Sequence, residues 1–231
     1  MHETEKEYLD IGEERWGRVA ERLRRLALYR NSKCVFVSPE AALKQVRLNV
    51  LTDGKVLVIP SGSLKKGFLK VDPRAVTPGR RPAAVDPRTG NPFASKIPYR
   101  SVLSPPIDLM VATARAVGRD GSRHGDGCGH LDLQYAILSE LGWMAENVKL
   151  VAIVHESRVF SSLEVTDHDV DVHWIVTPCE SIQTLSPRKP QGKIRWDLLN
   201  RRRIRTSDPL FYLSGHHLRD HPPPPRHTNE S

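Results

Sequence analysis

The sequence has no long apolar run: none of its 231 residues lies in a window approaching the ~18 consecutive apolar residues that a membrane span requires. Its first residues, Met1 to Glu14, are acidic and polar, whereas a secretory signal is cationic and then apolar. The three cysteines, Cys34, Cys128 and Cys179, are an odd number spread widely, which argues against a disulfide framework. We therefore expect an intracellular protein without membrane contact, in the cytoplasm first, with organelles and the nucleus as alternatives.

Positive charge is in excess, but it is not evenly spread. The formal net charge is +8. Residues 185–231 hold ten Lys and Arg against four Asp and Glu, and so supply +6 of that charge. Residues 1–184 are nearly balanced, which gives no reason to expect a polyanion as the partner of the main domain.

Residues 185–231 also differ in composition from the rest. They contain seven of the 18 prolines, four histidines and few aliphatic residues outside Pro209 to Leu213. Such a segment buries too little apolar surface to offset its ordering entropy, so we predict one α/β domain over 1–184 and a disordered basic tail over 185–231. The run Arg201 to Arg205 contacts RNA, serves as a nuclear import signal, or is merely solvated charge.

Apolar runs alternate with helical patterns along the main domain. Helical spacing of apolar residues predicts helices over 16–27, 41–51 and 131–142, and short Val, Ile and Leu runs predict strands over 34–37, 55–59, 107–112, 148–154 and 172–176. Continuous apolar strands separated by helices are typical of a parallel sheet covered on both faces. We therefore predict a three-layer α/β/α fold with a mostly parallel sheet.

The stretch from Pro60 to Pro106 departs from this alternation. It contains nine prolines and several turn dipeptides, such as Pro78-Gly79. We predict a long loop or lid that faces the substrate, because long ordered loops on a compact scaffold tend to carry binding function.

Glycines gather after the predicted strand at 107–112. Five of the 15 glycines fall between Gly118 and Gly129, directly before the helix predicted to start near Leu131. Glycines let backbone N–H groups converge on an anion, and the helix adds its positive dipole end. The segment matches neither the P-loop nor the dinucleotide fingerprint, so its spacing alone fits a phosphate cradle and a tight structural turn equally.

Three segments carry a family resemblance. They are Ile107-Asp108-Leu109, Arg123-His124-Gly125-Asp126-Gly127-Cys128-Gly129-His130-Leu131-Asp132, and His168-Asp169-Val170-Asp171-Val172-His173-Trp174-Ile175-Val176-Thr177-Pro178. In order and spacing they resemble the 5-formyltetrahydrofolate cyclo-ligase family, also called methenyltetrahydrofolate synthetase. The stretches 132–138 and 154–156 resemble its methenyltetrahydrofolate synthetase domain-containing members. The resemblance covers about 33–183 and implies a fold like that of ribose-5-phosphate isomerase and CoA-transferases.

The resemblance also implies an activity and its site. Members of the family use MgATP to phosphorylate the formyl oxygen of 5-formyltetrahydrofolate, a reduced formylated folate, and release 5,10-methenyltetrahydrofolate. By resemblance Arg123 is the catalytic residue and contacts phosphate. The nucleotide-binding set is Arg123, Gly125, Gly127, Gly129 and His130. Asp132 would hold Mg²⁺, with a helix N-cap as the alternative reading. Arg15 and Arg18 are candidates for the family's N-terminal nucleotide-binding basic residues.

The sequence departs from the family pattern inside this loop. The departures are Asp126, where the family usually has a basic or aromatic residue, and Cys128, His130 and Leu131. A carboxylate at Asp126 would repel ATP phosphates by about 1 kcal/mol or more for each close contact. A second hypothesis is therefore a noncatalytic family member that binds a nucleotide, RNA or a protein partner.

Two His-acid pairs remain. His168-Asp169 is either part of a metal site or a structural pair at a strand entrance, and the absence of further ligands favours the structural reading. His155-Glu156, which follows a predicted strand, fits a buried hydrogen-bonded pair and a site equally.

Overall fold

A computed structural model describes residues 13–88, 90–124, 130–166, 169–185, 187 and 192–220. Its centre is an eight-stranded sheet in the order β11-β10-β8-β5-β1-β2-β3-β4. The strands are β1 (Cys34–Val37), β2 (Val56–Pro60), β3 (Phe68–Val71), β4 (Ser95–Lys96), β5 (Ile107–Thr113), β8 (Met144–Ile153), β10 (Trp174–Val176) and β11 (Ser181–Gln183). The five strands from β10 to β2 run parallel, and β3, β4 and β11 are antiparallel additions at the edges. The predicted mostly parallel sheet is confirmed.

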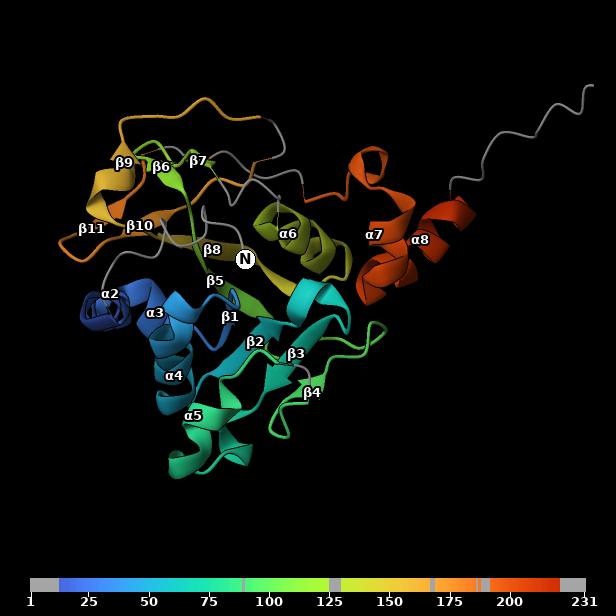
Figure 1. Ribbon diagram of the computed structural model, residues 1–231, viewed down its shortest axis with the longest axis horizontal. Helices are drawn as coiled ribbons and strands as arrows, with labels where there is room; N and C mark the ends of the chain where they lie inside the picture. The colour runs from blue at the N-terminus through green and yellow to red at the C-terminus, as the bar shows by residue number, and fades with distance from the viewer. Residues whose placement is uncertain are drawn as a thin grey trace, which may run out of the picture.

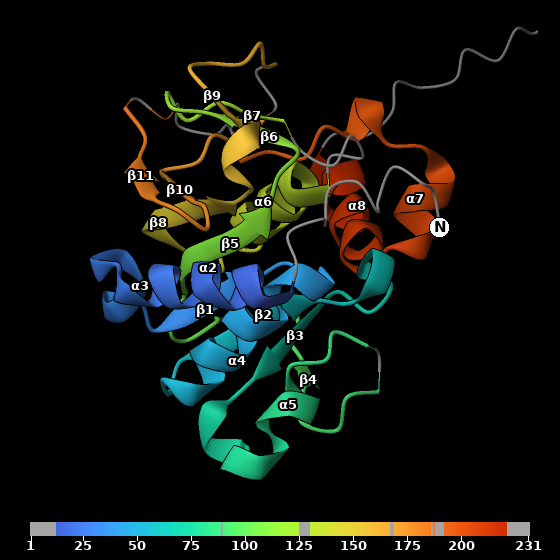
Figure 2. The same cartoon turned by 60° about the vertical axis from the view of Figure 1, so that its left-hand side comes forward.

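Helices cover both faces of this sheet (Figures 1 and 2). One face carries α2 (Glu13–Arg25), α3 (Ala27–Asn31), α4 (Lys44–Thr52) and α5 (Arg81–Ala84), and the other carries α6 (His130–Glu140), α7 (Arg201–Thr206) and α8 (Asp208–Asp220). Each face encloses its own buried apolar cluster. The predicted three-layer α/β/α arrangement is therefore confirmed.

Strand β1 shows why the sheet needs two covers. All four of its residues are buried, and successive side chains point to opposite faces. Val35 and Val37 pack in the cluster under α2 and α4, whereas Cys34 and Phe36 pack in the cluster under α6. A strand that is apolar on both faces is stable only in the middle layer.

A second, three-stranded sheet lies beyond the main one. It contains β6 (Ala116–Gly118), β7 (Arg123–His124) and β9 (Val159–Phe160), in the order β7-β6-β9. Strands β6 and β7 follow β5 directly, and β9 follows β8. This small sheet therefore extends the chain from the carboxyl ends of two central strands.

The prediction that residues 60–106 form one long loop is wrong. The segment contributes β3 and β4 to the sheet. The single turn η2 (Gly62–Leu64) precedes β3, and the turns η3 (Pro73–Ala75) and η4 (Pro78–Arg80) and helix α5 lie between β3 and β4. Phe68, Leu69 and Val71 are buried, so this short apolar run pairs with β2 even though prolines surround it. The prolines begin the turns, where their fixed φ is favourable.

The prediction of a disordered tail is wrong for residues 192–220. After the turn η6 (Trp196–Leu198), helices α7 and α8 pack on the cluster under α6, where Leu210 is fully buried and Leu213 is 8% exposed. Asp208 forms an ion pair with Lys96 and accepts a hydrogen bond from the Tyr99 hydroxyl at 3.0 Å. The short apolar stretch 209–213 is enough to order α8, because its buried residues lie on one helix face and pack on an existing core. Residues 221–231 lie outside the described part.

Over the described ranges, none of the helices is both long enough and apolar enough to cross a bilayer.

Truncating Leu210 tests the docking of α8. Because Leu210 is fully buried, Leu210→Ala should lower the free energy of unfolding by ~2–5 kcal/mol. The matched control is Phe211→Ala, which should change it by no more than ~0.5 kcal/mol because Phe211 is 62% exposed. Urea unfolding of both variants measures the difference, and equal small effects would show that α8 does not pack on the domain.

Candidate active site

Five loops meet where the parallel strands end. They leave β1 at Ser38–Glu40, β2 at Ser61–Gly62, β5 at Ala114–Arg115, β8 at Val154–Glu156 and β10 at Thr177–Cys179. The Ser38 N–H donates to the Val111 carbonyl at 3.0 Å, and the Val154 N–H donates to the Val176 carbonyl at 3.3 Å. The loops are thus tied to neighbouring strands at the carboxyl edge, where open parallel sheets bind ligands.

A buried ion pair joins the two ends of the glycine-rich segment. Arg123 in β7 is 1% exposed, and its Nη2 pairs with Asp132 Oδ1 in the first turn of α6. Arg123 Nε also donates to the Val170 carbonyl at 3.1 Å, and the Val170 N–H donates to Asp132 Oδ1 at 2.9 Å. One guanidinium and one carboxylate therefore fix both ends of the segment to the chain that enters β10.

This contact bears on the residues that the sequence singles out. Gly125, Asp126, Gly127, Cys128 and Gly129 lie outside the described residues. His130 is the first residue of α6 and is exposed.

The N-cap reading of Asp132 is wrong. Helix α6 already begins two residues earlier, and the carboxylate binds groups outside the helix. The phosphate contact of Arg123 and the Mg²⁺ contact of Asp132 stay predictions.

Asp132 meets one requirement of a Mg²⁺ ligand. The side chain is 17% exposed, and its protein contacts all fall on Oδ1, so Oδ2 faces no protein donor among the described residues. Within the described part of the chain, no group of three or more His, Cys, Asp or Glu side chains converges as a metal site. Mg²⁺ that arrives with a nucleotide usually takes only one or two carboxylates, with phosphate and water as the other ligands. Among the described residues, the single free oxygen of Asp132 therefore fits Mg²⁺ that is brought by a nucleotide.

Helix α2 brings positive charge to the same edge. Arg15, Arg18 and Arg22 follow each other at three- and four-residue spacing, so they share one helix face. Arg15 Nη1 lies 3.5 Å from His155 Nε2, and Arg22 Nη2 donates to the Pro178 carbonyl at 3.1 Å. These contacts place the basic face of α2 against the loops that leave β8 and β10.

The loops after β8 and β10 add a cluster of titratable groups. His155 Nε2 lies 3.5 Å from Glu156 Oε1, which accepts a hydrogen bond from Cys179 Sγ at 3.4 Å. The pKa of Glu156 is lowered by a hydrogen bond from its own backbone N–H and, to a smaller extent, by the Cys179 thiol. The Glu156 carboxylate in turn raises the pKa of the Cys179 thiol. The side chains of His155 and Glu156 are 29% and 38% exposed, so the pair is only partly buried, and its reading as a site stays a prediction.

Arg22 Nε and Glu156 Oε2 are buried at this edge and have no hydrogen-bond partner among the described residues. Buried polar atoms are nearly always satisfied, so each such atom calls for an explanation. A ligand or an ordered water bound at the carboxyl edge would satisfy both atoms.

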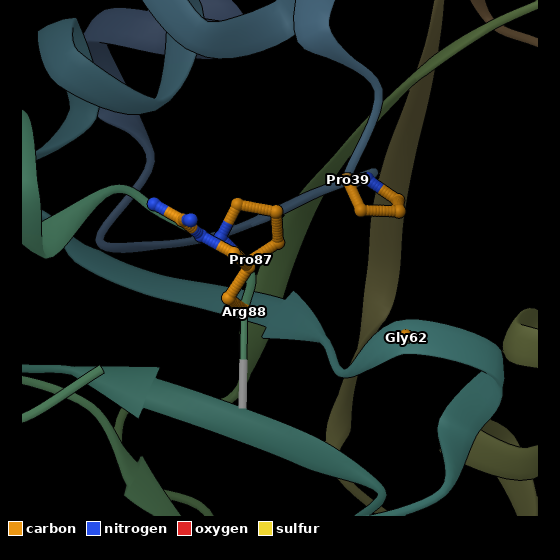
Figure 3. Close-up of a pocket in the computed structure, with 4 residues that line it drawn as sticks. All are labelled: Pro39, Gly62, Pro87 and Arg88. Carbon is orange, nitrogen blue, oxygen red and sulfur yellow. The ribbon is translucent and has the colours of Figure 1, made fainter. Parts of the chain in front are cut away.

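A hollow of about 390 Å³ opens beside β1 and β2. It is lined by Pro39, Gly62, Pro87 and Arg88 (Figure 3). Pro39 and Gly62 come from the loops after β1 and β2, and the other two come from the proline-rich stretch that was predicted to face the substrate.

Arg47 holds the walls of this hollow together. Its guanidinium is 2% exposed and donates to the carbonyls of Ser38 at 2.7 Å, Glu40 at 3.0 Å and Val85 at 3.1 Å. Burial lowers its pKa to about 10, which still leaves it charged at neutral pH. Sequence reasoning missed Arg47, although an arginine inside the apolar pattern Leu43, Val46, Val50 is the signal that could have revealed it.

Asp169 has a structural role. Its Oδ2 accepts hydrogen bonds from the backbone N–H and the hydroxyl of Thr166 at 2.8 and 2.9 Å. This agrees with the structural reading of the pair, although His168 lies outside the described residues.

Comparisons with known proteins match most of the chain, including the candidate site. A family model described as the 5-formyltetrahydrofolate cyclo-ligase family matches residues 5–178. The methenyltetrahydrofolate synthase domain-containing proteins of Bos taurus and Homo sapiens are 31% identical over 191 residues and 34% identical over 180 residues. These alignments cover 79% and 74% of this chain but 49% and 45% of the relatives, so the chain spans about half the length of the curated relatives that it matches.

The fold is shared with a solved structure. The NMR structure of the 5,10-methenyltetrahydrofolate synthetase of Aquifex aeolicus matches with a TM-score of 0.51 at 18% sequence identity. The match covers 82% of this chain and 88% of that one.

A double-mutant cycle tests the Arg123–Asp132 pair. Arg123→Met should cost ~3 kcal/mol or more of unfolding free energy, because it leaves the Asp132 carboxylate mostly buried beside a single N–H donor. Combining it with Asp132→Leu should cost less than the sum of the two single changes. Urea unfolding of the four proteins measures the coupling, and strictly additive losses would show that the pair does not hold the segment.

Proposed function

We propose a function from one premise: this chain belongs to the 5-formyltetrahydrofolate cyclo-ligase family. The function is the ATP- and Mg²⁺-dependent conversion of 5-formyltetrahydrofolate to 5,10-methenyltetrahydrofolate at the carboxyl edge of the sheet. The observation that carries the proposal is the buried Arg123–Asp132 pair, which joins the ends of the glycine-rich segment, while His124 beside it bonds Arg115 in the loop after β5. The basic face of α2 supports it from the opposite side.

The reaction needs a protein that positions its reactants and concentrates positive charge. ATP with Mg²⁺ supplies the phosphoryl group that makes the formyl oxygen a leaving group, after which the neighbouring amine closes the ring and phosphate departs. Phosphoryl transfer asks the protein mainly for orientation and electrostatic stabilisation. We assign the stabilisation to Arg15 and Arg18 of α2 and to the backbone N–H groups between Arg123 and Asp132.

Arg123 and Asp132 then have distinct tasks. The guanidinium of Arg123 is 1% exposed and bonded on two nitrogens, so in this arrangement it positions the segment rather than meeting a ligand. Direct contact with phosphate would fall to Nη1, which takes no part in these two bonds. Asp132 would hold Mg²⁺ through Oδ2 while Oδ1 keeps the ion pair.

The folate is assigned to the hollow beside β1 and β2. Its volume of about 390 Å³ lies in the range of small-molecule sites. Pro39, Gly62 and Pro87 offer flat apolar walls to a ring system, and Arg88, whose Nε and Nη2 bond Asp86, would offer its Nη1 to a carboxylate. Arg47 would act as a positioning residue by fixing both walls.

The product is measurable directly. Purified protein incubated with MgATP and 5-formyltetrahydrofolate should generate the absorbance of 5,10-methenyltetrahydrofolate, and omission of ATP or chelation of Mg²⁺ should abolish it. Arg15→Ala combined with Arg18→Ala should raise the KM for ATP roughly tenfold or more, since charge-assisted contacts to phosphate are lost.

Arg25→Ala combined with Arg30→Ala removes the same charge from exposed positions nearby and serves as the control, with an unchanged KM expected. Absence of product at high enzyme concentration would overturn the proposed reaction and leave the noncatalytic alternative.

A further inference from the structure

A basic surface is built from two distant parts of the chain. We define it by five exposed side chains, Lys65, Lys66, Arg201, Arg202 and Arg205. We infer that this basic surface binds single-stranded nucleic acid. The inference does not depend on the proposed ligase reaction.

Contacts bring the two parts together. The turn that carries Lys65 and Lys66 continues into Gly67, where an added Cβ would lie 2.3 Å from the Tyr99 hydroxyl oxygen. The same hydroxyl donates to Asp208, the first residue of α8, and Arg205 lies three positions before Asp208. Figures 1 and 2 both show the turn after β2 beside α8. Lysines after β2 and arginines of α7 therefore share one side of the molecule.

The arginines of this surface are not consumed by neighbouring acids. Asp208 pairs with Lys96, Asp197 pairs with Arg195, and a Glu140 oxygen accepts from the Ile194 N–H. Over the described residues, no ion pair involves Lys65, Lys66, Arg201, Arg202 or Arg205. An ordered helix thus presents its guanidinium groups to solvent instead of using them for folding.

The residue types favour nucleic acid over other polyanions. The guanidinium fork of arginine matches phosphate bidentately, and arginine supplies three of the five charges. Phe211 follows α7 in the first turn of α8 and is 62% exposed, which offers a ring on which a base can stack. A single-stranded nucleic acid uses both the phosphate contacts and the stacking ring, whereas an acidic peptide would use only the charge.

Fluorescence anisotropy of labelled RNA and DNA strands of about 12 nucleotides tests the inference, with the full chain titrated at several salt concentrations. Arg201→Gln, Arg202→Gln and Arg205→Gln combined should weaken binding tenfold or more. The slope of log affinity against log salt should fall by about 2, since each phosphate contact to a single strand contributes ~0.7.

A matched triple variant, Arg25→Gln, Arg30→Gln and Arg80→Gln, removes the same charge from exposed positions on the other helical layer. It should bind like the wild type, and equal losses in both triple variants would overturn the inference. Phe211→Leu should weaken binding about fivefold or more, whereas Phe211→Tyr should preserve it.

Unlabelled poly-glutamate and phosphatidylserine vesicles serve as competitors. Competition by either that is as effective as competition by the unlabelled strand would assign the surface to a peptide or a membrane and overturn the inference. Preference for the RNA or the DNA strand identifies the natural class of ligand, and binding of neither strand rejects the inference outright.

Discussion

The buried contact between Arg123, Asp132 and the Val170 backbone is the constraint on which the candidate site depends. Burying two charges costs desolvation energy, and such a pair is stable only when further hydrogen bonds satisfy it. Here the two backbone groups of Val170 do so, one for each partner. Three segments that are distant in sequence, namely β7, α6 and the chain entering β10, are thereby held together.

The parallel sheet determines which loops lie near this contact. Because β1, β2, β5, β8 and β10 all point the same way, their loops meet at one edge. Arg47 fixes the loop after β1 to the proline-rich stretch, and the arginines of α2 reach the loops after β8 and β10. A buried cation thus shapes the walls, while exposed cations remain for ligands. That division matches what phosphoryl transfer requires of a protein.

Local patterns predicted the central strands and helices, because each has an unbroken apolar run or a helical repeat of apolar residues. Strand β1 and helix α6 lie close to the predicted bounds. The pairing of β3 with β2 could not be predicted, since the apolar run of β3 is interrupted by Lys70 and lies among prolines. The docking of α8 was missed for a related reason: composition over 185–231 averages a short apolar face with many charges, and only the contacts of Leu210 and Asp208 reveal its partner.

The candidate site also has features that the sequence could predict and features that it could not. The family resemblance predicted that Arg123 and Asp132 belong to the site. It could not predict that they bind each other, because that contact depends on the path of β7 and α6 in space. The apolar pattern around Arg47 could mark it as a buried arginine, but the sequence could not give its partners, which are backbone carbonyls from two separate loops.

The central claim is that the segment between Arg123 and Asp132 holds the phosphates of ATP. Hydrogen–deuterium exchange of the full chain, with and without MgATP, measures this most directly, because amides that contact phosphate exchange more slowly. The account predicts slower exchange in peptides spanning 123–132 and in α2, with little change in peptides of α5. Unchanged exchange over 123–132 at a nucleotide concentration that saturates binding would contradict it.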